Sequence, residues 1–392
     1  MRGLRGWTLA CVVFAGLSCN GPARGPDAEA PRSTYLGGEP RQLTRLRPER
    51  AFVYVPGEAW AYSHHPYIAS FGGQLVAIWS NGRRDEDAPG QRVVLSRSED
   101  GQVWSEPEVL AQPRTDAEGV EFVLTAAGFH EHEGVLAAYI ARYREDKSET
   151  GLSVVTTRDG VEWTDPIDLG VAMSPNEGPR RLASGALLIP GHSAFARTDD
   201  RAGLGGWTMS GTYPAEWEGF EDNPATIWSV RERLERAAPL CEASIIERDG
   251  VILAMLRATG DGFSGELWLT HSADDGRSWS EPEPTAFPDN DHKFQFGRMR
   301  DGRFFYLGCP DPMPRHRRSP LVLSLSSDGR VYDQHFVLAD EPYERRYAGR
   351  SKGGQYGYPR LVEHDGHVWV IVSRQKEAIE VLWFPLADLD QR

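Results

Sequence analysis

The sequence lacks the cysteine and histidine patterns that mark a metal site or a disulfide scaffold. Its 392 residues include four cysteines, and only Cys241 and Cys309 lie beyond the first 19 residues. No C-x-x-C, H-E-x-x-H or EF-hand spacing occurs, and neither a P-loop nor a dinucleotide-binding fingerprint is present. We therefore predict no metal and no cofactor. Two cysteines are too few for a disulfide framework. Cys241 and Cys309 could form one disulfide or remain two buried thiols, and the sequence leaves both alternatives open.

Basic residues are outnumbered by acidic ones. The chain has 43 Lys and Arg against 57 Asp and Glu, a formal net charge of −14. Nucleic acids and anionic membranes are bound by clustered Lys and Arg, so we expect neither as a partner. The overall negative charge does not exclude a local basic pocket.

No apolar run is long enough to span a bilayer as a helix. Arg2 and Arg5 precede an apolar run over 7–17, the layout of a secretory signal peptide, which we assign to residues 1–19. We expect export to the periplasm or cell surface. Gly16 to Cys19 resembles a lipoprotein cleavage site with Leu17 displaced by one position, so a lipid anchor at Cys19 and ordinary cleavage are both open. Residues 20–40 have no packing pattern and are predicted as a disordered tether.

A hairpin of one kind recurs six times. Each copy has two β-rich runs around a glycine that suits a tight turn. The turn glycines recur every 51 to 65 residues and are Gly73, Gly134, Gly185, Gly250, Gly302 and Gly366. This period corresponds to about four short strands per repeat.

A second motif interleaves with the hairpins: a hydroxyl residue, an acid, a glycine and an aromatic residue. Its copies are Ser98–Trp104, Thr157–Trp163, Ser272–Trp279 and Ser326–Tyr332, and a decayed copy is expected near 198–207. The acid can accept backbone N–H groups while glycine supplies the unusual φ, so the motif is structural. Both periods predict an all-β fold, a six-bladed β-propeller of four-stranded antiparallel blades over 41–392.

The second motif is that of the Asp-box, and through it the chain resembles the sialidase (neuraminidase) superfamily, whose catalytic domain is a six-bladed propeller. The resemblance spans essentially all of the mature chain. Asp-boxes also occur in propellers that are not sialidases, so the motif indicates fold more strongly than activity.

The register of the hairpins predicts a polar pocket on the propeller axis. We expect the first strand of each hairpin to be the innermost strand of its blade. Position −8 from the turn glycines is occupied by His65, Ala126, Glu177, Glu242, Phe294 and Tyr358. The returning strands bring, among others, Arg142, His192, Arg257 and Arg374 to the same end. Core positions would be mainly aliphatic, so these polar types indicate a site.

The resemblance assigns roles to some of these residues. It implies that Tyr358 is the nucleophile, with Tyr356 as the alternative, and that Glu242 is its base. Arg257, fifteen residues after Glu242, would grip a substrate carboxylate. A second family arginine corresponds to Arg318 or Arg317. The family's acid/base aspartate corresponds to Asp87 or Asp85, with Asp87 preferred.

The chain departs from the family in its first blade, which has His64 and His65 where the family has an arginine, and in the loop of Asp85 and Asp87, which has no motif to choose between them. The two histidines, together with Glu177, Arg180 and His192, are candidate substrate-binding residues. The leading hypothesis is an exo-glycosidase with a retaining mechanism that acts on a terminal sugar of a glycan, and we expect this sugar to be anionic. The histidines keep open a polysaccharide lyase or a rhamnosidase-like enzyme, and a non-catalytic glycan-binding propeller is the third hypothesis.

Overall fold

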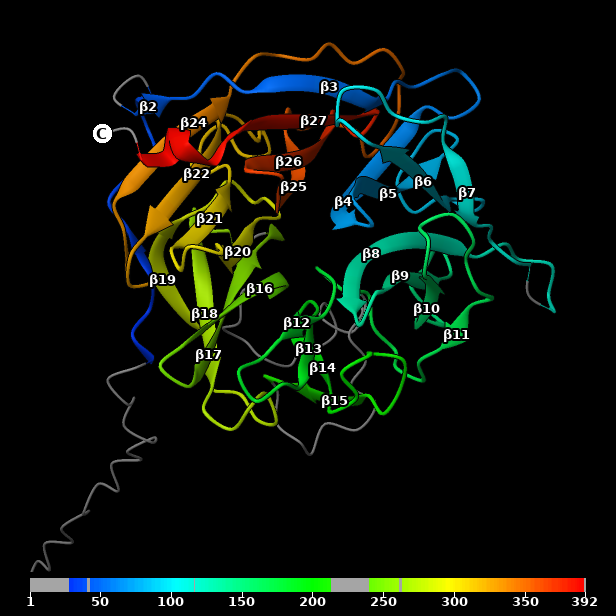
Figure 1. The fold of residues 1–392 in the computed structure, drawn as a ribbon, viewed down its shortest axis with the longest axis horizontal. Helices are drawn as coiled ribbons and strands as arrows, with labels where there is room; N and C mark the ends of the chain where they lie inside the picture. Colours follow the sequence, from blue (N-terminus) through cyan, green and yellow to red (C-terminus); the bar gives the residue numbers. More distant parts are fainter. Residues whose placement is uncertain (1–27, 41–42, 116, 213–239, 261–262, 391–392) are drawn as a thin grey trace, which may run out of the picture.

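Six β-sheets are arranged around a central axis (Figure 1). The computed structural model describes residues 28–40, 43–115, 117–212, 240–260 and 263–390. The predicted six-bladed propeller of antiparallel blades is confirmed. The predicted signal peptide and Cys19 lie outside the described residues, and within those residues no helix is long and apolar enough to cross a membrane.

In each blade the strands follow one another in chain order from the axis outward, except that N-terminal strands form the outer edges of the last two blades. The first three blades are β4 (Tyr62–Phe71), β5 (Gln74–Gly82), β6 (Arg92–Ser98) and β7 (Glu108–Ala111); β8 (Val123–His132), β9 (Val135–Tyr143), β10 (Gly151–Thr157) and β11 (Ile167–Asp168); and β12 (Arg180–Arg181), β13 (Leu187–Pro190), β14 (Ala194–Thr198) and β15 (Thr208–Gly211). The other three are β16 (Leu240–Arg248), β17 (Val251–Ala258), β18 (Glu266–Ser272) and β19 (Glu283–Pro288); β20 (Gln295–Arg298), β21 (Phe304–Gly308), β22 (Leu321–Ser326) and β24 (Gln334–Ala339), extended by β2 (Thr44–Arg45); and β25 (Gly357–His364), β26 (His367–Arg374), β27 (Ala378–Pro385) and β3 (Glu49–Tyr54). A 3₁₀-helix, η4 (Leu386–Asp390), follows β27.

The hydrophobic core is divided among the seams between blades. Six clusters of buried apolar side chains each join two neighbouring sheets. One example packs Trp79 of the first blade with Ile371 and Val381 of the last. A single blade cannot bury either of its faces, so the ring must close for any blade to be stable.

The N-terminal segment closes the ring. Strand β3 pairs with β27, with Phe52 opposite Glu380. Part of the segment predicted as a tether is also structured, because β1 (Arg32–Ser33) pairs in parallel with β23 (Val331–Tyr332). The Tyr35 hydroxyl donates to Asp311 at 2.6 Å. The segment is held by backbone hydrogen bonds to the free edge of β23. Such pairing does not depend on amino-acid composition, so composition could not predict it.

The Asp-box turns are built as predicted. The Asp100 carboxylate accepts the backbone N–H groups of residues 102 and 103, both at 2.9 Å, and the Ser98 hydroxyl accepts that of Gly101. The third blade keeps a lengthened copy, in which Asp200 accepts the N–H groups of Ala202 and Leu204. These turns connect the outer strands and contribute no side chain to the axis.

Gly128 on β8 packs against the backbone of Gly178, just before the third blade. Its φ is +110°, and a Cβ there would lie 2.3 Å from the backbone nitrogen of Gly178. Gly128→Ala is therefore expected to lower the free energy of unfolding by at least about 2 kcal/mol, measured by urea denaturation. Gly134→Ala is the matched control, because its φ is +72° but nothing lies within 4 Å, and we expect a loss of about 1 kcal/mol. Equal losses would contradict the close approach.

Candidate functional site

In three inner strands the residue that the hairpin register singled out lies within a β-bulge. The ladder shifts register near His65 in β4, Glu242 in β16 and Tyr358 in β25. These residues have φ values of 52°, 51° and 55°, which non-glycine residues seldom adopt. A bulge turns a side chain out of the regular alternation, and such strain concentrates at functional sites. All three side chains reach one cavity.

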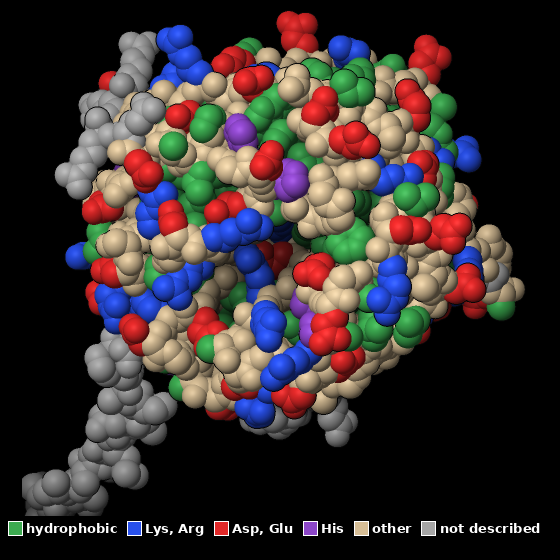
Figure 2. Space-filling view, in the orientation of Figure 1, with side chains coloured by type: hydrophobic (Ala, Val, Ile, Leu, Met, Phe, Trp, Pro, Cys, Tyr) green, Lys and Arg blue, Asp and Glu red, His purple; other side chains and the backbone are tan. Residues whose placement is uncertain are grey.

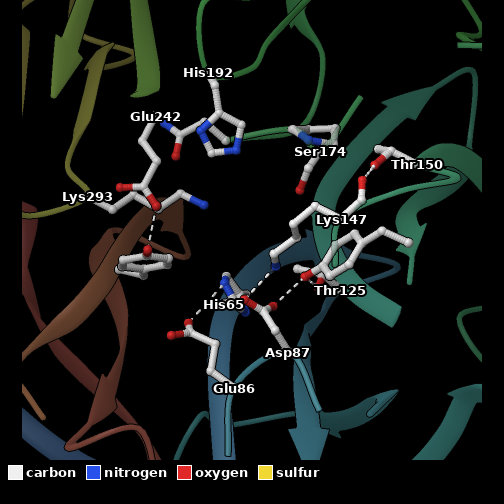
Figure 3. A pocket seen from close by; sticks show the side chains of 14 residues that line it. His65, Glu86, Asp87, Thr125, Lys147, Thr150, Ser174, His192, Glu242 and Lys293 are labelled. Carbon is white, nitrogen blue, oxygen red and sulfur yellow. Dashed lines mark hydrogen bonds and ion pairs between the residues drawn. The ribbon is translucent and has the colours of Figure 1, made fainter. Parts of the chain in front are cut away.

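The cavity has a volume of about 240 Å³ and lies at the open ends of the inner hairpins. Figure 3 shows its side chains converging from several blades. Its lining residues are His65, Glu86, Asp87, Thr125, Tyr143, Lys147, Thr150, Ser174, Pro175, Asn176, His192, Glu242, Lys293 and Tyr358. A pocket with several convergent polar groups is the expected form of a small-molecule site.

Tyr358 and Glu242 form the central pair of this cavity. The Tyr358 phenol donates a hydrogen bond to one Glu242 oxygen, and Arg257 donates to the other. Burial favours the protonated form of Glu242, but Arg257, Lys293 and Tyr358 outweigh it, so the pKa of Glu242 lies well below its usual range. Burial and the Glu242 charge raise the pKa of Tyr358 well above its usual value. The pair is thus a neutral phenol held by a carboxylate.

Arg257 lies behind Glu242 and is not among the residues that line the cavity. Its Nε donates to Asp291 at 2.5 Å, and Asp291 also accepts from Arg315. Arg257 and Asp291 are both buried. The contact predicted between Glu242 and Arg257 is therefore present, and in this structure it orients the carboxylate from behind.

Lys293 is a buried cation that the sequence analysis did not single out. Its Nζ lies 4.6 Å from the centre of the Tyr358 ring. Burial and the nearby Arg360 lower the pKa of Lys293 to about 7, although Glu242 and Glu177 act in the opposite direction. It stands one residue before the −8 position of its hairpin. The sequence signal that could have identified it is a lysine directly before an apolar inner strand.

The loop after the first hairpin presents Asp87, and not Asp85, to the cavity. Asp87 accepts the Tyr143 hydroxyl at 2.6 Å and pairs with Lys147 at 2.5 Å; Figure 3 shows Asp87 and Lys147 facing each other. Asp85 accepts the backbone N–H of Arg350 outside the cavity. Between the two alternatives, Asp87 is thus the one placed to reach a ligand.

The comparison with known proteins supports the same architecture. The model of the BNR repeat-like domain family matches residues 73–370. The chain belongs to this family. No curated protein sequence matches significantly.

Solved structures share the fold of this BNR repeat-like propeller. A protein of unknown function from Dyadobacter fermentans DSM 18053 has a TM-score of 0.62 at 14% identity, over 86% of this chain and 98% of that one. Trypanosoma rangeli sialidase in complex with sialic acid has a TM-score of 0.60 at 13% identity, over 89% and 60%. A further sialidase has a TM-score of 0.58 at 20% identity, over 93% of this chain and 35% of its own length. Identities this low establish the sialidase-like fold and nothing finer.

Several candidate residues of the BNR repeat-like propeller lie away from the cavity. Arg317 is exposed, and the buried Tyr356 donates to the backbone of Glu341 at 2.9 Å. Arg318 is buried with its guanidinium carbon 5.4 Å from the Tyr358 ring centre, but it does not line the cavity. Only His65 and His192 of the remaining candidates line it, and His64 lies directly behind His65.

Glu177 and Arg180 form an ion pair and are not among the residues that line the cavity. Arg180 donates to Glu177 at 3.0 Å and to the backbone of Phe296 at 2.6 Å. Arg180 also lines a second hollow, toward the turn ends of the inner hairpins. The pair of Glu177 and Arg180 therefore links neighbouring blades and does not reach the site of Tyr358.

On the face seen in Figure 2, Lys and Arg side chains gather around a central hollow.

Proposed function

We propose that the protein is an exported exo-glycosidase that removes a terminal anionic sugar with retention of configuration. The observation that carries this proposal is the hydrogen bond from the Tyr358 phenol to the ionised Glu242 in a polar cavity. A phenol is a weak nucleophile at neutral pH and needs such a base. The sialidase-like fold supports the same chemistry, since tyrosine nucleophiles are a recognised exception among glycosidases.

The residues divide the reaction into two displacements. The Tyr358 oxygen attacks the anomeric carbon while Glu242 takes the phenolic proton. In the form of the protein in which Asp87 carries a proton and is released from Lys147, Asp87 gives that proton to the departing glycosidic oxygen as that bond breaks. Water then attacks the glycosyl–tyrosine intermediate, Asp87 takes the proton of the water, and Glu242 returns the proton to Tyr358. Each proton is conserved and both carboxyl groups recover their starting states.

Lys293 supplies the positive charge on which the choice of an anionic sugar rests. Lys293 faces the Tyr358 ring within the cavity, and a neutral phenol attacks beside a substrate carboxylate with less repulsion than a carboxylate would. The small volume of the cavity suits one terminal sugar unit, which is the basis for exo action.

The titration of Lys293 makes substrate affinity depend on pH. Its pKa of about 7 leaves it charged below neutral pH and neutral above, so KM for an anionic substrate should rise by about tenfold between pH 6 and pH 8.5. In Lys293→Met, KM should be higher than in the unsubstituted protein at pH 6 and should not change with pH. Steady-state kinetics over this range, with folding checked by circular dichroism, measures both. A flat KM in the unsubstituted protein would contradict the role of Lys293.

A polysaccharide lyase is the second candidate, and His65 is the observation that favours it. Burial and Lys293 hold the pKa of His65 well below its usual value, so the ring is neutral. Its centroid lies 5.1 Å from that of Tyr358. A neutral imidazole can take the proton next to a uronate carboxylate.

A screen of aryl glycosides of sialic, uronic and neutral sugars tests the proposal, together with a set of uronate polysaccharides. Turnover of an anionic aryl glycoside, with the first-formed product anomer retained by NMR, supports the glycosidase. Formation of ultraviolet-absorbing unsaturated uronate supports the lyase. Binding of glycans without turnover would overturn both and favour a binding propeller. Cell fractionation of the full chain tests export, and acylation at Cys19 tests the anchor.

A further inference from the structure

His64, His65 and Glu86 form a group beside Tyr358 that the proposed glycosidase steps do not use. One donor atom from each lies within 4.8 Å of the other two. The His64 Nε2 and His65 Nε2 atoms lie 3.8 Å and 3.7 Å from the same Glu86 oxygen, Oε1. The His65 and Glu86 side chains face each other in Figure 3. Two imidazoles and one carboxylate are the donor set of many zinc and other transition-metal sites.

The spacing of these atoms suits one small cation. Donors about 2.1 Å from a tetrahedral ion lie about 3.4 Å from one another, and the two measured distances exceed this by a few tenths of an ångström. His64 supplies an independent observation. Its side chain is fully buried, yet among the residues that the structure describes its Nε2, which faces Glu86, has no hydrogen-bond partner. A buried polar atom without a partner requires an explanation, and an ion at this point supplies one.

The outer contacts orient all three groups. The Nδ1 atom of His64 lies 2.7 Å from the Ser373 hydroxyl, and that of His65 lies 3.2 Å from the Ser80 hydroxyl. Lys376 pairs with the other oxygen of Glu86, Oε2. Each group thus has its second polar atom engaged, and Oε1 of Glu86 also accepts the Tyr62 hydroxyl at 3.3 Å. The two Nε2 atoms face this same oxygen, which is the arrangement of supported metal ligands.

We propose that His64, His65 and Glu86 bind a divalent transition-metal ion such as Zn²⁺. His65 and Glu86 line the cavity, so a fourth coordination position opens toward the substrate. The ion lies among the cations Lys376, Lys293 and Arg318, whose charges act on His64. These charges oppose a bare cation and favour an anionic oxygen as fourth ligand. A substrate carboxylate fits this position, in the blade where the family resemblance led us to expect an arginine.

Metal titration of the full chain tests this site without any activity assay. The purified protein is stripped with a chelator, then titrated with Zn²⁺ by calorimetry and with Co²⁺ by visible absorption. We expect one ion per chain and a ligand-field spectrum of a site with nitrogen and oxygen donors. Glu86→Gln should weaken Zn²⁺ binding by at least about 100-fold and Ser373→Ala by about 10- to 100-fold.

His335→Asn provides the matched control. His335 is a histidine held by two hydroxyl groups, Thr34 and Ser324 at 2.8 Å each, and it lies outside the group. Its variant should bind Zn²⁺ as the unsubstituted protein does, and circular dichroism confirms folding of each variant. No binding at millimolar Zn²⁺ would overturn the proposal, as would unchanged affinity in folded Glu86→Gln. Neither result bears on the roles of Tyr358 and Glu242, so the two proposals fail separately.

Discussion

Tyr358→Phe is expected to lower kcat/KM for the best anionic aryl glycoside by at least about 10³-fold, with KM changed less than about threefold. The substitution removes the attacking oxygen and keeps the ring that contacts His65 and Lys293. It also leaves Glu242 with Arg257 as a partner, so the fold should persist. Steady-state kinetics of the purified variant measures both constants.

Two further variants test whether the loss of activity reflects the roles of Glu242 as base and Tyr358 as nucleophile. Glu242→Gln keeps the shape of the base but cannot accept the phenolic proton, and should lower kcat by about 10²- to 10⁴-fold. Tyr356→Phe is the matched control, because its hydroxyl donates to the backbone of Glu341 outside the cavity, and its activity should stay within about twofold. If Tyr356→Phe is inactive while Tyr358→Phe keeps its activity, the assignment of the nucleophile is wrong.

The repeats explain why so much of the architecture could be predicted. Tight turns at regular intervals define the hairpins, and the two-residue period of a strand then relates His65, Glu242 and Tyr358 to one end of the ring. The same counting brings Arg257 beside Glu242, and the salt bridge between them forms. Local rules were sufficient here because both residues of the pair belong to one hairpin.

The remainder of the site depends on contacts between blades. Asp291 reaches Arg257 from the loop between the fourth and fifth blades, and Lys293 follows it to Tyr358. The group of His64, His65 and Glu86 has no spacing motif, because Glu86 comes from a loop after β5 whereas the histidines are adjacent in β4. Adjacent residues of a regular strand point to opposite faces, and the bulge next to His64 removes that alternation. The absence of a metal motif therefore has little weight for this pocket.

Arg257→Met is expected to reduce the free energy of unfolding at neutral pH by about 3–5 kcal/mol. Arg257 is the cation that contacts both Glu242 and Asp291, and both carboxylates are buried. Asp291 retains Arg315 after the substitution, whereas Glu242 retains the phenol of Tyr358 and the partly charged Lys293. The cost arises from a buried carboxylate that has lost its main counter-charge. Urea denaturation at pH 7 measures it.

The dependence of this loss on pH separates charge from packing. In the unsubstituted protein the pKa of Glu242 is lowered, so the carboxylate stabilises the fold above its ordinary pKa of about 4.3, and this contribution disappears as the pH falls. In Arg257→Met, burial is less opposed and the pKa of Glu242 moves upward, so the difference between the two proteins should shrink toward pH 4. Arg142→Met is the control, because Arg142 pairs with Asp168 at an exposed position and should cost about 0–1 kcal/mol at any pH. A loss for Arg257→Met that stays constant with pH would show that Arg257 acts through packing and not as the counter-charge of Glu242.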